Sequence, residues 1–177
     1  VQLAGGAVLE NLGTITTPTG CCWWAFRPYT APDGTVSTGT LVNRGTINTV
    51  DATNWWGITT KFDNQGTVNV AANSTFYVNA DANTGPQRVT GTWTIGTGAT
   101  LSFSGEWQNG EGWSPNSMSI AGAASITGPG RVSLSNIVLE ASRDLANVDV
   151  SNLRGPGSLR ITQSGAIYGA LMGPGRV

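Results

Sequence analysis

The sequence predicts an all-β chain wound as a single parallel β-solenoid of about seven or eight coils over residues 1–177, and three observations predict it. Only 11% of the residues are charged, and Gly, Thr, Ser and Asn stand in their place, as in strands joined by tight turns. Short stretches alternate apolar and polar residues, which is the period of a half-buried strand. The turns between these stretches repeat one another, as the corners of stacked coils do.

The first half of the chain repeats one turn in three close copies. Residues 9–16 read LENLGTIT, residues 41–48 read LVNRGTIN, and residues 62–69 read FDNQGTVN, with a looser copy at 89–95. In each close copy an asparagine stands two residues before a glycine, and the pairs are Asn11 and Gly13, Asn43 and Gly45, and Asn64 and Gly66. We expect the asparagine amides to form an internal ladder and the glycines to take a positive φ at the corners. A row of ligands is the functional alternative for the asparagines.

The second half of the chain changes this turn to Gly-Pro-Gly, at residues 128–130, 155–157 and 173–175. Gly128 and Gly155 therefore join the expected turn residues. The unequal steps between repeat glycines indicate insertions that loop out at one corner, as solenoids tolerate.

We expect Trp-rich loop insertions near residues 18–38 and 51–61, the two longest stretches between repeats. No stretch has a convincing helical apolar period. Residues 141–150 come nearest to one, and only weakly. Turns and loops are therefore expected to join the strands, without helices.

Seven aromatic side chains form the most informative set outside the repeat: Trp23, Trp24, Tyr29, Trp55, Trp56, Trp107 and Trp113. Both Trp pairs fall in the longest insertions, so we expect them on loops at one side of the solenoid. Aromatic rings anchor protein interfaces and also stack on sugar faces, so lateral packing and glycan binding are both open, beside simple core filling.

No catalytic set is recognisable. The chain has no histidine to act as a base for the adjacent thiols of Cys21 and Cys22. Glu106 and Glu111 resemble a glycosidase pair, but Asn109-Gly110 between them predicts a hairpin turn that would place both in solvent. Residues 79–85 carry alternating oxygen side chains as in a calcium loop, with a single charge among them. We therefore expect no enzyme, no metal and no cofactor.

Threonine pairs two residues apart, such as Thr14 and Thr16 or Thr92 and Thr94, raise the possibility of an ice-binding face. Such a face needs the pair on the same side of every coil. Other repeats carry Asn or Val there, which argues against it.

The net charge of −1 and the single lysine, Lys61, argue against nucleic acid as a partner. No apolar run approaches 18 residues, so no membrane span is expected.

Three runs carry a resemblance to a known family. They are Asn-x-Gly-Thr-Val-x-Val at 64–70, Gly-Ala-Thr-Leu-x-Phe-x-Gly at 98–105, and Ile-x-Gly-x-Gly-x-Val at 126–132. This pattern resembles the right-handed parallel β-helix repeats of bacterial cell-surface and autotransporter-like adhesin proteins. The resemblance implies an extracellular or cell-surface location and a role as a stalk, adhesin or matrix protein. The Trp-rich segments depart from the pattern.

The motif GPGRV occurs at 128–132, where a strand follows it, and again at 173–177, where the sequence stops. Joined to VQL at the start, the final copy would read on into a strand. We expect an assembly interface of eight residues: Val1, Gln2, Leu3, Gly173, Pro174, Gly175, Arg176 and Val177. The partner is either another copy, stacked head to tail, or flanking repeats of a longer chain.

These expectations favour a structural subunit or repeat module of an extracellular fibre, sheath or adhesin stalk. The alternative is a carbohydrate-binding module that uses the Trp-rich segments to hold polysaccharide.

Overall fold

The computed structural model describes residues 1–17, 23–50, 55–80, 84–108, 112–113, 118–169 and 171–172. For Trp23, Trp107 and Trp113 it describes the backbone alone. This part of the chain is all-β, and the strands pair mostly in parallel, as the sequence predicts for a β-solenoid. Within these residues no helix is long and apolar enough to cross a membrane.

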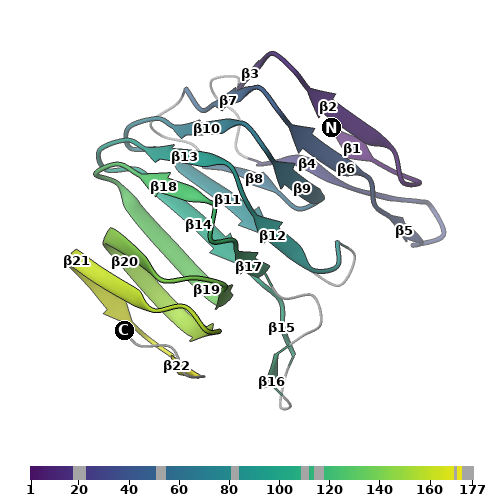
Figure 1. The fold of residues 1–177 in the computed structure, drawn as a ribbon. Helices are drawn as coiled ribbons and strands as arrows, with labels where there is room; N and C mark the ends of the chain where they lie inside the picture. Colours follow the sequence, from purple (N-terminus) through teal and green to yellow (C-terminus); the bar gives the residue numbers. More distant parts are fainter. Residues whose placement is uncertain are drawn as a thin grey trace.

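The chain passes repeatedly through three faces, and Figure 1 shows the successive strands side by side from the N-terminal to the C-terminal end. The first face begins with β1 (Gln2–Leu3), β4 (Trp23–Thr30), β8 (Trp55–Ile58), β11 (Thr75–Asn79) and β14 (Thr100–Ser104). The second face holds β2 (Val8–Asn11), β6 (Thr40–Asn43), β9 (Lys61–Asn64), β12 (Gln87–Val89) and β17 (Met118–Ile120). The third face holds β3 (Thr14–Thr16), β7 (Thr46–Asn48), β10 (Thr67–Val70), β13 (Thr92–Ile95) and β18 (Ser125–Thr127).

Longer strands build the C-terminal part: β19 (Arg131–Leu139), β20 (Arg143–Arg154), β21 (Leu159–Ile167) and the short β22 (Leu171–Met172). The first half of β19 pairs with β14 and its second half with β17, so one strand turns the corner between two faces. The weak helical candidate at 141–150 lies mostly in β20, in agreement with the expected absence of helices.

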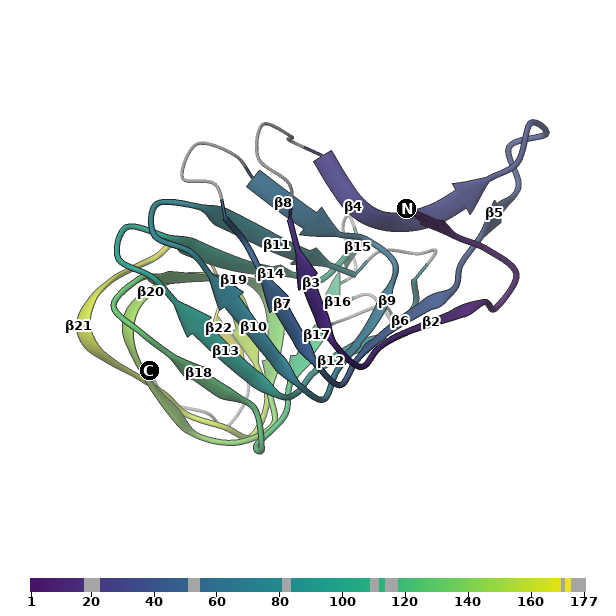
Figure 2. The ribbon, with the colours of Figure 1, turned by 90° about the horizontal axis from the view of Figure 1, so that it is seen from above.

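Two antiparallel hairpins leave the body. β4 pairs with β5 (Val36–Ser37), and β15 (Trp107–Gln108) pairs with β16 (Gly112–Trp113). The second hairpin is the one that Asn109-Gly110 predicts. In Figure 1 it projects beyond the stacked strands, and in Figure 2 β5 stands away from the body at the N-terminal end.

The core consists of rows of side chains that run from coil to coil. Register places one inward row on the first face in the order Phe26, Ile58, Val78, Phe103, Leu134 and Val150. All six are buried. Trp93 fills the middle of the core from β13 and donates its indole N–H to the Thr90 carbonyl at 2.7 Å. Each such large apolar side chain stabilises the fold by about 1.5–3 kcal/mol.

A ladder of asparagine side chains forms one corner. Asn11 donates its amide to the side-chain oxygen of Asn43 at 2.7 Å, and Asn43 donates in turn to Asn64 at 2.7 Å. All three are buried. The ladder satisfies polar groups that would otherwise be unpaired in the core, which is why the motif repeats with asparagine.

The prediction of a positive φ at every repeat glycine is wrong for Gly13, Gly45 and Gly66, whereas Gly128 and Gly155 have φ of 114° and 115°. Space is the reason for glycine in the first half. A Cβ on Gly45 would overlap the carbonyl oxygen of Gly13, and one on Gly66 would overlap that of Gly45. Gly13 belongs to the first coil and has open space at the same position.

Candidate functional site

The ends of the solenoid expose side chains that belong to core rows. On the second face Leu9 lies beside Leu41, which is fully buried, yet Leu9 is 36% exposed. At the other end Leu171 pairs with Leu153, which is buried, yet Leu171 is 46% exposed. The first and last coils thus expose apolar side chains whose equivalents in the inner coils are buried.

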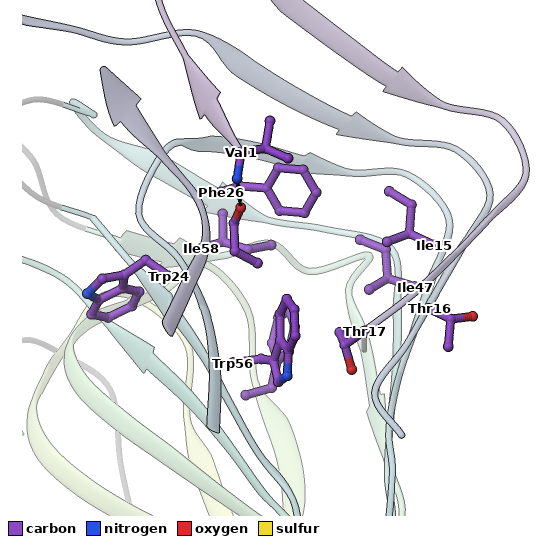
Figure 3. Close-up of a pocket in the computed structure, with 11 residues that line it drawn as sticks. Val1, Ile15, Thr16, Thr17, Trp24, Phe26, Ile47, Trp56 and Ile58 are labelled. Carbon is purple, nitrogen blue, oxygen red and sulfur yellow. Dashed lines mark hydrogen bonds between the residues drawn. The ribbon is translucent and has the colours of Figure 1, made fainter. Parts of the chain in front are cut away.

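Val1 and Ile167 lie at opposite ends of one row. Gln2 pairs with Arg27, so Val1 lies beside Phe26, as Figure 3 shows. Ile167 pairs with Val150 at the far end of the row. Val1 is 68% exposed and Ile167 45%, while the six members between them are buried.

Of the eight predicted assembly residues, the structure describes Val1, Gln2 and Leu3. Gln2 is exposed, Leu3 is buried, and the Val1 amino group donates to the Ala25 carbonyl at 2.7 Å. Gly173, Pro174, Gly175, Arg176 and Val177 lie outside the described residues.

An apolar cavity of about 380 Å³ opens at the N-terminal end. Figure 3 shows Ile15 and Ile47 to the right, Ile58 to the left and Trp56 below. The indole N–H of Trp56 is buried and has no hydrogen-bond partner among the described residues. The cavity adjoins β4. In β4, β1 pairs with Arg27 and Pro28 only. The first half of β4 is therefore not covered by β1.

Trp24, Trp55 and Tyr77 form an aromatic cluster on the outside of the first face. Their ring centroids lie 5.4–6.3 Å apart with interplanar angles of 65–87°, so the rings meet edge to face. Trp24 lies over Gly57, where any Cβ would overlap its ring. All three aromatic residues are partly exposed.

The prediction that the Trp pairs lie on loops is wrong. Trp23 and Trp24 begin β4, and Trp55 and Trp56 begin β8. Because strand residues alternate in direction, Trp55 joins the outer cluster while Trp56 pairs with inward Phe76 and lines the cavity. The structure does not bring all seven aromatic residues together. Tyr29 lies farther along β4 toward β5, and Trp107 pairs with Trp113 in the projecting hairpin.

Charged side chains are paired across the second face. Arg88 on β12 donates to Glu140 at 2.6–3.0 Å, and Ser119 donates to the same carboxylate at 2.7 Å. These hydrogen bonds, the one from Arg88 above all, hold the pKa of Glu140 below its ordinary value. Arg143 donates to the carbonyls of Ala121 and Ala124, and burial lowers the pKa of its guanidinium.

The structure describes few of the residues that the sequence suggested for catalysis or metal binding. Glu106 is described and has interaction partners, whereas Glu111 lies outside the described residues, as do Cys21, Cys22 and residues 81–83. Among the described residues no group of three His, Cys, Asp or Glu side chains could hold a metal ion.

Sequence reasoning missed a second asparagine corner. Asn136 and Asn152 have φ of 56° and 59°, and they bend β19 and β20 where these strands change face. Asn152 donates to the Asn136 side chain at 3.0 Å, and Asn136 donates to the Gly105 carbonyl at 3.1 Å. The repeated triplets Ser-Asn-Ile at 135–137 and Ser-Asn-Leu at 151–153 were the available signal.

The geometry thus defines a parallel β-solenoid with apolar end coils and an outer aromatic cluster. Comparison with protein-family models, with curated proteins and with solved structures finds no match.

Proposed function

We propose that the chain is a structural module of an extracellular fibre, sheath or adhesin stalk, in which further β-coils continue the solenoid at both ends. The observation that carries this proposal is the row from Val1 to Ile167, which is buried inside and exposed at its two ends. Its end members would become buried if another coil of the same kind stacked on them.

Unpaired strand edges also favour a further β-coil as the partner at the N-terminal end. In the described residues β2 pairs only with β6 and β3 only with β7, so each has one edge without a strand. Unpaired strand edges are templates for further strands. A coil added there would form backbone hydrogen bonds with these edges and would also bury the exposed apolar side chains. A ligand without a strand could bury the side chains but could not pair with the edges.

The coil is supplied by another copy of the chain or by a flanking repeat. In the first case the contact is head to tail and does not close, so it produces a filament. In the second case one polypeptide builds a long rod. Both cases make the protein an elongated scaffold.

Sedimentation velocity of the chain over a range of concentrations tests stacking of copies. We expect concentration-dependent oligomers, which Ile167→Lys should weaken at least tenfold because it places a charge at the end of the apolar row. Ser133→Lys is the matched control, since Ser133 is half-buried on the outer side of the same face in the middle of the body. A chain that stays monomeric at every concentration would contradict head-to-tail copies.

The second candidate function is polysaccharide binding at Trp24, Trp55 and Tyr77. It is favoured by the clustering of three partly exposed aromatic rings on one face. Titration with oligosaccharides while tryptophan fluorescence is recorded tests it. A saturable change that Tyr77→Ala removes would support binding at the cluster, and the absence of any change would exclude the glycans used.

A further inference from the structure

The outward side chains of the third face form two columns of hydroxyl and amide groups on five successive strands. Register places the first residues of the strands in one column, which consists of Thr14, Thr46, Thr67, Thr92 and Ser125. The second column consists of Thr16, Asn48, Asn69, Thr94 and Thr127. Six of the ten are exposed and four are half-buried.

The columns are regular because the core behind them is regular. The residues between the two columns point inward, and Ile47, Val68 and Trp93 among them are buried. The pairings from β3 through β18 contain no register shift. Neighbouring groups are therefore spaced about 4.8 Å across the strands and about 6.6 Å along them. Figure 2 shows the five strands side by side.

The chemistry of the array is uniform. None of the ten side chains carries a charge. Each hydroxyl can donate one hydrogen bond and accept others, and each amide does both as well. Threonine has few side-chain rotamers, and the amide of Asn69 donates to Asn48 at 2.8 Å, so the threonines and this amide pair have little conformational freedom to lose when a ligand binds.

The structure weakens the objection that the sequence raised against an ice-binding face. Asn48 and Asn69 do replace threonine, but they lie in the second column on the same side as Thr16 and Thr94. Val70, which follows Asn69, is an inward residue of the core and takes no part in the columns. The array is thus continuous over five coils.

We propose that the third face binds the surface of ice. Ice presents a neutral lattice in which every water molecule both donates and accepts hydrogen bonds, and the array repeats in two dimensions with the same property. A discrete soluble ligand usually binds in a concave pocket, whereas an extended sheet face suits an extended lattice. Many weak contacts then act together. This proposal does not depend on end-to-end stacking, although stacking would lengthen the array.

The test grows an ice crystal slowly in a dilute solution of the fluorescently labelled full chain and measures the label in the ice. We expect incorporation of the wild-type chain. Thr67→Tyr should reduce incorporation at least tenfold, because the ring would hold the lattice away from the centre of the array. Thr100→Tyr is the matched control: Thr100 is also half-buried and also begins a strand, but on the outer side of the first face.

Circular dichroism of each variant establishes that it is folded. Thr94→Lys, at an exposed site of the second column, provides an independent block if Thr67→Tyr does not fold. It should abolish incorporation as well. Exclusion of the wild-type chain from the growing ice would overturn the proposal, and so would equal incorporation of the folded third-face variants and Thr100→Tyr.

Discussion

Val1 and Ile167 are the exposed ends of one row of side chains that is buried along the rest of its length. The row joins seven strands of the first face in register, from β4 to β21, with Val1 before β1 at its start. A protein whose core opens to solvent at both ends has two surfaces that an added coil would bury.

Replacement of Asn43 by Ala should destabilise the fold by about 1–3 kcal/mol, because it leaves the Asn11 amide and the Asn64 oxygen buried without these partners. Urea denaturation followed by circular dichroism measures the change. Asn69→Ala is the control, since its side-chain hydrogen bond to Asn48 is half-exposed and its loss should cost less. Equal losses of stability in the two variants would show that burial of the asparagine ladder does not determine its contribution to stability.

Alanine at Gly45 should destabilise the fold by about 1–3 kcal/mol, since the new Cβ would overlap the Gly13 carbonyl oxygen. Alanine at Gly13 should stay within about 0.5 kcal/mol of the wild type, because nothing lies within 4 Å of that Cβ. The free energies of unfolding of the two variants, measured in urea, give the comparison. A Gly13→Ala chain as unstable as Gly45→Ala would contradict the explanation by space.

Gly13→Ala should weaken self-association even though it leaves the single chain stable. In the body the carbonyl of the preceding turn occupies the position of each equivalent Cβ, so a stacked coil would occupy it at Gly13 too. Sedimentation velocity of Gly13→Ala beside the wild type checks this. Unchanged association would mean that copies do not stack with the register of the inner coils.

Acid should weaken the fold partly through Glu140. Its pKa is lowered in the folded chain by the hydrogen bonds from Arg88 and Ser119, so its contribution to stability is full above the ordinary glutamate pKa. That contribution is lost as pH falls through the lowered pKa. Glu140→Gln should therefore flatten the dependence of the unfolding free energy on pH below about 4.3. A slope in Glu140→Gln as steep as in the wild type would assign the acid sensitivity to other carboxylates.

The architecture could be predicted because its causes are local and repeated. Period-two alternation and the Asn-x-Gly turns appear directly in the sequence, and they specify strands and corners. The reason for glycine at Gly45 could not be predicted, since it depends on the distance between two coils rather than on the φ of one residue.

The placement of the tryptophans could not be predicted from the sequence for a similar reason. Whether Trp55 and Trp56 lie on a loop or a strand is decided by the register with β11, which no local signal contains. The columns of the third face also depend on register. Their residues were visible in the sequence, but the side of the sheet on which Asn48 and Asn69 lie was not.

Electron microscopy of native material tests the central claim most directly. Continued coils predict rods longer than the single chain, and stacked copies predict an axial repeat of about 35 to 40 Å, the length of eight coils at about 4.8 Å each. A rod without that repeat, built from one long polypeptide, would assign the added coils to flanking repeats. Discrete particles only one chain long, with Val1 and Ile167 open to solvent, would contradict the account.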